Sequence, residues 1–393
     1  MINFSAAMIF ISCFCLSLSV SVVSAQETVS MDSMLMRAKR PSLQLCPQCQ
    51  DQPNTEVIGK SSAPRQLFNS KAEDRLDEAL SAKLRAISAD DSVISLVFSR
   101  GTTILYEKYK DGVGPETQVL SLSMAKPLIS ILVGSARCKG VIKSLDDKAE
   151  IYSPALAGTA YGAASLRSLL TMRSGADYGA GSMGETSSGE TGRWAFGVGS
   201  QIETMKARSG YNKRLFGQDK EGDWYYKNMD VYALSLVIRD SHQEPVSKLT
   251  QRYLWDKIGA EHNATWVLDR NKDPIVASFF AAGAHDWIRL AVYIAESIKE
   301  AGADPCFSRY LRDATTSKQT VKDELGFTGY GYLFRLNYLN DQTKAIVWFR
   351  GAFGQMLAIH PDTGFTIFLQ SNHIRNLIPV ADIFSDWISK HGK

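Results

Sequence analysis

The spacing of hydrophobic positions predicts a helix and two strands near the beginning of the folded part of the chain. Residues 72–88 carry apolar side chains at helical intervals, and residues 92–98 and 102–109 have the pattern of strands. Ser99-Arg100-Gly101 separates the two strands and predicts a hairpin.

The C-terminal part returns to strand patterns and ends in a helix. Two strand pairs are expected, joined by turns at Asn340-Asp341 and at Pro361-Asp362-Thr363-Gly364. The expected elements are strands 329–338, 344–350, 355–360 and 365–370, followed by a helix at 377–390.

Helical periodicity dominates the middle of the chain. Helices are expected at 165–172, 228–240, 244–258 and 285–300. Strands at both ends of the chain around central helices predict an α/β (α+β) fold, in which one sheet built from both ends receives an inserted helical lobe. We therefore expect a sheet domain of residues 72–150 and 270–393 and a helical lobe of residues 151–269.

The composition is that of an ordinary globular protein, with 45% hydrophobic and 22% charged residues among 393. This length allows a large core and two lobes. The net charge of +3 is too small to indicate a nucleic-acid partner or a membrane surface.

Residues 1–25 have the pattern of a signal peptide. An apolar stretch ends in Val23-Ser24-Ala25, a small-residue cleavage site, although no Lys or Arg precedes it. No other apolar run has membrane length, so we expect an exported protein, periplasmic or secreted, without stable membrane insertion after cleavage. Residues 26–71 follow as a polar, proline-containing extension that is expected to be irregular.

Four cysteines lie beyond the expected cleavage site: Cys46, Cys49, Cys138 and Cys306. Cys46 and Cys49 form a C-x-x-C without the second pair that a zinc site needs, so a local disulfide or unreacted thiols are expected there. An exported protein can oxidise its cysteines, and the sequence leaves the pairing of these four open.

Ser123 and Lys126 form a Ser-x-x-Lys pattern at the start of an apolar segment. Helical residues three apart share a face, so both side chains are expected to point the same way. Pro127 suits a first helical turn, whose amides have no helical partner, and the apolar residues that follow would hold this turn rigidly. Burial can lower the pKa of a lysine enough for it to act as a base. The pattern therefore predicts a serine nucleophile with a lysine base; the alternative is a chance spacing of two common residues.

Two further segments carry groups that an acyl-transfer site requires. Tyr226, just before the helix at 228–240, would pass the proton of the nucleophile to a leaving group, unless it is simply an aromatic residue near a helix cap. The segment Gly351–Gln355 interrupts a strand, and one of its amides would join that of Ser123 in stabilising an oxyanion, unless the glycines form a plain bulge.

The sequence contains no motif that favours another catalytic scheme. The chain has no G-x-S-x-G, H-x-H or H-E-x-x-H, and the G-x-G-x-x-G spacing at 179–184 follows no strand. His285, His360 and His373 are expected to be structural or exposed, and no spacing favours a Ser/His/Asp triad. We therefore expect neither a metal nor a cofactor.

Together these segments resemble the serine β-lactamase and penicillin-binding-protein superfamily, on its class C β-lactamase-like side, and most closely its esterases and 6-aminohexanoate-dimer hydrolases. The resemblance covers the chain from about Ser92 to the C-terminus. It rests on five segments in the family's order: Ser123-Met124-Ala125-Lys126, Ser144-Leu145-Asp146-Asp147, Leu169-Leu170-Thr171-Met172-Arg173-Ser174-Gly175, Gly222-Asp223-Trp224-Tyr225-Tyr226-Lys227-Asn228 and Gly351-Ala352-Phe353-Gly354-Gln355. It implies a β-lactamase/transpeptidase-like fold, an antiparallel sheet flanked by helices.

The resemblance also implies roles for individual residues. Ser123 would be the acylated nucleophile, Lys126 its general base, and Tyr226 the proton relay. The second oxyanion amide would come from Ala352 or Phe353. The implied substrate- and oxyanion-binding positions are Asn228, Gly351, Ala352, Phe353, Asp177 and Tyr178.

The chain departs from the family pattern in three places. Arg350-Gly351-Ala352 stands where other members carry Lys-Thr-Gly, whose lysine helps to bind the β-lactam carboxylate, so strong β-lactamase activity is not expected. Arg350 would either replace that charge or face solvent from its strand. Glu221 replaces a usual proline, and the long loop Gly179 to Gly217 is expected to shape the acyl pocket.

These features predict an exported serine hydrolase that cleaves ester, linear amide or peptide bonds of a small-molecule or peptide-like substrate through an acyl-enzyme on Ser123. One alternative is a β-lactamase or D-alanyl-D-alanine carboxypeptidase that acts on cell-wall-related substrates. Another is a catalytically silent member that binds peptidoglycan or a partner, although the intact Ser123, Lys126 and Tyr226 argue against it.

Overall fold

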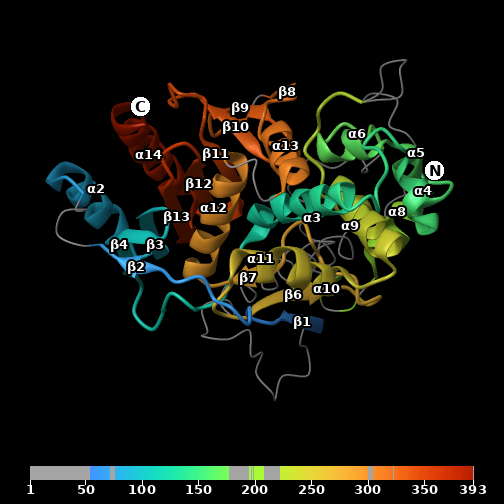
Figure 1. The fold of residues 1–393 in the computed structure, drawn as a ribbon, viewed down its shortest axis with the longest axis horizontal. Helices are drawn as coiled ribbons and strands as arrows, with labels where there is room; N and C mark the ends of the chain where they lie inside the picture. The colour runs from blue at the N-terminus through green and yellow to red at the C-terminus, as the bar shows by residue number, and fades with distance from the viewer. Residues whose placement is uncertain are drawn as a thin grey trace, which may run out of the picture.

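The computed structural model of the chain describes residues 54–70, 76–176, 194–195, 197, 199–207, 222–299, 304–321 and 323–392. Figure 1 shows a large sheet on the left, a group of helices from the middle of the chain on the right, and helix α3 (Lys126–Cys138) between them. This arrangement confirms the expected mixed fold with an inserted helical lobe.

The larger sheet has nine strands among the described residues, in the order β2-β4-β3-β13-β12-β11-β10-β9-β8. The strands are β2 (Phe68–Asn69), β3 (Val93–Arg100), β4 (Thr103–Tyr109), β8 (Gln319–Thr320), β9 (Phe327–Tyr330), β10 (Arg335–Tyr338), β11 (Val347–Arg350), β12 (Met356–His360) and β13 (Phe365–Ser371). Every pair is antiparallel except β2 with β4. Because β3 pairs with β13, with Val97 opposite Phe368, both ends of the chain build the sheet as predicted.

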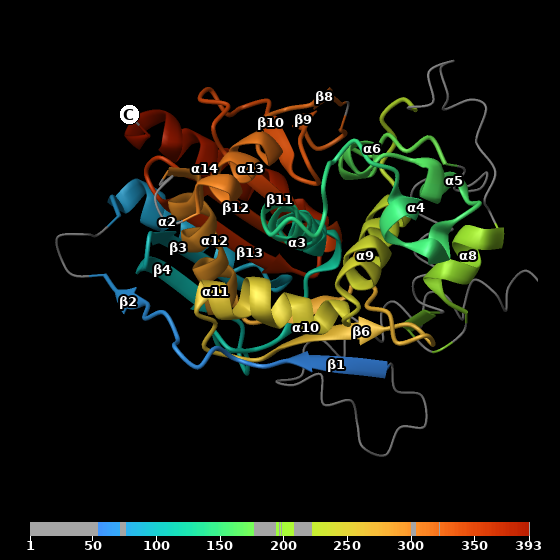
Figure 2. The same ribbon diagram turned by 45° about the vertical axis from the view of Figure 1, so that its right-hand side comes forward.

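Helices cover both faces of this sheet. Helices α2 (Glu78–Ser88) and α14 (Leu377–His391) lie on one face, and α12 (Ala284–Lys299) lies on the other (Figure 2). Side chains alternate along β3, so that Leu96 and Phe98 join the core under α2 and α14, whereas Val97 joins the core on the opposite face. The sheet is therefore a central layer with an apolar core on each side.

The helical lobe lies on the right in Figure 1, on the other side of α3 from the large sheet. Its elements are α4 (Ala149–Tyr152), α5 (Ala160–Ala163), α6 (Leu166–Leu170), α8 (Gln201–Ala207) and α9 (Asn228–His242). After α9 the chain forms α10 (Val246–Thr250), a π-helical stretch (Gln251–Trp255) and α11 (Asp256–Ile258), where one continuous α-helix was expected. Helix α13 (Pro305–Ala314) packs against α3 and α12.

A second sheet, with four strands in the part of the chain that the structure describes, lies below α10 and α11 in Figure 1, in the order β1-β6-β7-β5. Its strands are β1 (Asn54–Ile58), β5 (Val119–Leu120), β6 (Ala264–Leu268) and β7 (Phe280–Ala282). The expectation that residues 26–71 are irregular is wrong for β1 and β2. The backbone of β1 pairs with β6, which lies far along the sequence, and that of β2 pairs with β4. The predicted domain boundary at residue 270 falls between β6 and β7, which pair with each other. The predicted domain limits stay a prediction.

One predicted strand of the large sheet is in fact two. Residues 329–338 form the end of β9 and all of β10, with a turn at Gly331–Phe334 between them. Leu333 has a φ of 66°, a conformation that a leucine does not signal in the sequence. The apolar residues of this turn have high strand propensity, which explains why the pattern concealed the turn.

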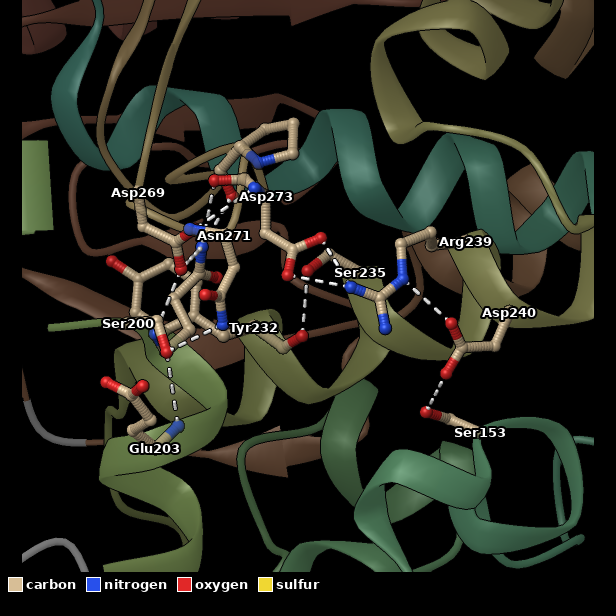
Figure 3. Close-up of polar contacts among 12 residues, drawn as sticks. Ser153, Ser200, Glu203, Tyr232, Ser235, Arg239, Asp240, Asp269, Asn271 and Asp273 are labelled. Carbon is tan, nitrogen blue, oxygen red and sulfur yellow. Dashed lines mark hydrogen bonds and ion pairs between the residues drawn. The ribbon is translucent and has the colours of Figure 1, made fainter. Parts of the chain in front are cut away.

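A polar network fastens the helical lobe to the connection between β6 and β7 (Figure 3). Asp269 accepts hydrogen bonds from the backbone amides of Asn271 and Asp273 and from that of Gln201, at the start of α8. Arg239 of α9 contacts both oxygens of Asp273, at 2.6 and 2.7 Å. Since these carboxylates are occupied by protein donors, the Asp-x-Asn-x-Asp spacing here is a structural turn.

A disulfide joins Cys138 at the end of α3 to Cys306 at the start of α13. The hydroxyls of Ser130 and Tyr310 lie 3.0 Å apart between the same two helices. This settles one pairing that the sequence left open; Cys46 and Cys49 lie outside the described residues. Within the described part of the chain, no helix combines the length and apolarity that a membrane span needs.

Candidate active site

Ser123 lies in a tight turn between β5 and α3. Residues Leu122–Ala125 form a 3-10 turn, and α3 begins at Lys126. Leu122 has a φ of 49°, a strained conformation for leucine that lets the chain leave the sheet and enter the helix abruptly. We expected an ordinary helical turn; the 3-10 geometry instead places side chains three residues apart directly above one another.

Lys126 reaches back to the serine. Its Nζ lies 2.7 Å from Ser123 Oγ and donates to the carbonyl of Ala277 at 2.8 Å. The side chain is 1% exposed, whereas Ser123 is only partly buried. Burial lowers the pKa of Lys126, and the positive charges of Arg335 and Arg350 lower it further, although Tyr226 acts in the opposite direction.

Tyr226 completes a three-residue cluster with Ser123 and Lys126. Its ring centroid lies 4.8 Å from Lys126 Nζ, and its hydroxyl hydrogen-bonds with both residues. Burial alone would raise the pKa of Tyr226, but Lys126, Arg335 and these hydrogen bonds outweigh burial and lower the pKa to about 8. The cluster can therefore exchange a proton near neutral pH.

The segment that carries Tyr226 is held by the Leu169–Gly175 motif. The amide of Gly222 donates to the carbonyl of Arg173 at 2.9 Å, and that of Tyr225 donates to Met172 at 3.0 Å. Two sequence motifs that are far apart along the chain therefore lie side by side and fix the entry to α9.

Gly351 brings the end of β11 against the nucleophile turn. A Cβ on this residue would lie 2.5 Å from the carbonyl oxygen of Ser121 and 3.2 Å from the amide nitrogen of Met124, so only glycine fits without movement. The amide of Gly351 donates to Gln355 at 2.8 Å, which leaves Ala352 and Phe353 as the oxyanion donors to consider. Phe353 has a φ of 57° in the 3-10 turn Ala352–Gly354.

Arg350 is not a solvent-facing strand residue. Its side chain is 20% exposed, and its Nη1 lies 3.1 Å from Asp323 Oδ2. The same carboxylate binds Arg335, whose guanidinium carbon lies 4.8 Å from the ring centroid of Tyr226. Sequence reasoning missed Arg335; its only signal was a charge between the apolar residues Phe334 and Leu336.

Of the remaining predicted positions, the structure describes only Asn228. Asn228 is the first residue of α9 and is partly buried. Asp177, Tyr178 and most of the loop from Gly179 to Gly217 lie outside the described residues. Among the described residues, no group of three or more His, Cys, Asp or Glu side chains is arranged to hold a metal ion.

The sequence and the fold both identify the class of protein. A sequence model of the Beta-lactamase family matches residues 84–376, so the chain belongs to this family. The predicted superfamily, its fold and the serine hydrolase class are thereby confirmed.

Individual relatives share the fold at low sequence identity. A 6-aminohexanoate-dimer hydrolase of Paenarthrobacter ureafaciens is 24% identical over 274 residues, which cover 68% of this chain and 69% of the relative. The solved structure of a putative 6-aminohexanoate-dimer hydrolase from Bacillus anthracis has a TM-score of 0.67 at 16% identity and covers 86% of this chain and 90% of its own. That of EstCE1, a hydrolase with promiscuous acyltransferase activity, has a TM-score of 0.60 at 14% identity and covers 80% of this chain and 100% of its own.

Proposed function

We propose that the chain is an exported serine hydrolase that cleaves ester, linear amide or peptide bonds through an acyl-enzyme on Ser123. The observation that carries the proposal is the 2.7 Å contact between Ser123 Oγ and the Nζ of the buried Lys126. Because burial lowers the pKa of Lys126, its amine form is accessible and can accept the proton of the serine.

The geometry gives each residue of the cluster a step. Ser123 Oγ attacks the carbonyl carbon, its O–H bond breaks, and the proton passes to Lys126. Tyr226 then donates a proton to the leaving oxygen or nitrogen as its bond to carbon breaks, and recovers one from Lys126. Water hydrolyses the acyl-enzyme through the same groups in reverse.

The oxyanion that forms during attack needs amide donors. The amide of Ser123 together with that of Ala352 or Phe353 would supply them, because Gly351 holds this segment against the nucleophile turn. Asn228, Asp177 and Tyr178 would contact the substrate, as the family resemblance implies.

The names of the relatives support a small-molecule or peptide-like substrate. One relative is named for the 6-aminohexanoate dimer, and EstCE1 is described as a hydrolase with acyltransferase activity. Export rests on the signal-like pattern of residues 1–25, and N-terminal sequencing of the mature protein at Gln26 would test it.

The test is a rate assay on purified mature protein with a short-chain nitrophenyl ester, the 6-aminohexanoate dimer and a chromogenic cephalosporin. Wild type is compared with Ser123→Ala and with Ser135→Ala, a control serine on the same helix. We expect ester or linear-amide turnover that only Ser123→Ala abolishes, with little cephalosporin turnover.

Other outcomes would change the assignment. Fast cephalosporin turnover would indicate a β-lactamase. Activity that survives in Ser123→Ala would refute the proposed nucleophile. Failure of Ser123 to react with any activated ester or fluorophosphonate would indicate a silent, binding member of the family.

A further inference from the structure

Arg335 lies against the Tyr226 ring although no motif includes it. Its guanidinium carbon is 4.8 Å from the ring centroid of Tyr226, and it lies 5.7 Å from Tyr330 and 5.9 Å from Trp224. The side chain is 8% exposed. An arginine enclosed by three aromatic rings in this way has little freedom to move, so its charge has a fixed place beside the tyrosine.

The charges around Tyr226 do not cancel. Arg335 shares the carboxylate of Asp323 with Arg350, so one buried anion serves two guanidinium groups. Lys126 adds a third positive charge, with its Nζ 4.8 Å from the ring centroid of Tyr226. Glu324, which also acts on Arg350, is exposed. The described charged and titratable groups that act on Tyr226 or on its immediate neighbours are Lys126, Arg335, Arg350, Asp323, Glu324, Tyr330 and Asp230.

We propose that Arg335 is a positioning residue for acyl transfer, which acts by stabilising the negative charge that Tyr226 acquires when its proton leaves for the leaving group. This inference rests on the proposed function and adds a residue that the catalytic cluster itself does not contain. Arg335 forms and breaks no bond; it only makes the proton transfer from Tyr226 less costly.

The neighbouring tyrosine does not compete for this role. Burial raises the pKa of Tyr330 well above its usual value, and a negative charge on Tyr226 raises it further. Tyr330 therefore keeps its proton, whereas the pKa of Tyr226 is lowered to about 8. The two tyrosines differ for two reasons. The charge of Lys126 acts directly on Tyr226, and the hydroxyl of Tyr226 is hydrogen-bonded whereas that of the buried Tyr330 is not.

The test is the pH dependence of kcat/KM for the 6-aminohexanoate dimer between about pH 5.5 and 10, because an amide leaving group, unlike a nitrophenolate, takes the proton that Tyr226 supplies. Removing a positive charge raises the pKa of both Lys126 and Tyr226, so Arg335→Met should move the acidic limb of the profile upward by about one pH unit. Arg335→Lys, which keeps the charge, should move it less. Asp323→Asn removes a negative charge and should move the limb in the opposite direction.

A control and two outcomes make the test decisive. Arg167→Met removes an arginine that contacts a different tyrosine, Tyr332, and should leave the limb unchanged. If Arg335→Met lowers the rate equally at every pH, and Asp323→Asn leaves the limb in place, Arg335 has only a structural role. That result, with Ser123→Ala inactive, would overturn this inference alone; an active Ser123→Ala would overturn the proposed function instead.

Discussion

Lys227 Nζ lies 2.6 Å from Ser174 Oγ, which gives the chain a second close serine–lysine contact besides that of Ser123 and Lys126. Both Ser174 and Lys227 are 1% exposed. The Ser174 hydroxyl donates to Asp230 at 2.6 Å while it accepts from the lysine, so its proton is already committed to a carboxylate. The two contacts have similar distances, but only Ser123 combines the contact with access to solvent.

Replacing Lys227 should therefore affect stability more directly than chemistry. Lys227→Met leaves the fully buried Asp230 without its cation, 3.4 Å away, and should lower the free energy of unfolding by about 3–5 kcal/mol. Chemical denaturation measures this loss. The double variant Lys227→Met with Asp230→Leu removes both charges and should recover part of it; an unchanged unfolding midpoint in the single variant would contradict the structural role.

Tyr226→Phe should depend strongly on the leaving group. A nitrophenolate leaves without a proton, whereas an amide nitrogen needs one, so the variant should lose about 10²–10⁴-fold in rate on an amide and much less on the nitrophenyl ester. Tyr225→Phe is the matched control, since Tyr225 is the neighbouring residue and contacts Met172 through its backbone. Equal losses on both substrates would argue against a proton relay.

Gly351→Ala should impair turnover without unfolding the protein. The added Cβ would lie 2.5 Å from the carbonyl oxygen of Ser121, so β11 must move away from the nucleophile turn. A displacement of that order costs about 100-fold in kcat when it shifts an oxyanion donor. Gly59→Ala, where the Cβ meets only the end of the Gln251 side chain at 3.2 Å, should retain normal kcat.

His262 should make stability depend on pH. Its Nδ1 lies 3.2 Å from Asp286, and this hydrogen bond raises the pKa of the histidine above its ordinary 6.5. A raised histidine pKa adds stability that is fully present below about pH 6.5 and is lost as the pH rises through the folded-state value. Thermal unfolding at pH 5.5 and 8.5 should show a smaller pH effect in His262→Gln than in wild type or in the exposed-site control His391→Gln. An equal pH effect in all three proteins would contradict this.

The sequence predicted elements well where one period ran over many residues. The helix at 228–240 became α9, and strands 355–360 and 365–370 became β12 and β13. The prediction failed where tertiary contacts decide, as in β1, which is a strand only because β6 lies beside it.

For the site, local spacing brought Ser123 and Lys126 together, and family motifs added Tyr226 and Gly351. Ala277 had no signal, because a backbone carbonyl has no sequence signature. The only signal for Arg335 was its charge between two apolar residues, which does not reveal that β10 brings it against the ring of Tyr226. Nothing in the identity of Leu122 announces its positive φ, so the sequence concealed the sharp turn at Ser123.

The pairing of β3 with β13 also sets the order in which the protein can assemble. Val97 meets Phe368 only after nearly the whole chain has left the ribosome, so the centre of the large sheet forms late and over a long loop. Until then the β3–β4 hairpin keeps an unpaired edge of buried-type residues, which can associate with other chains. Shortened forms that lack β13 should consequently accumulate as aggregates. Chaperones that cover the unpaired edge of β3 should reduce this aggregation.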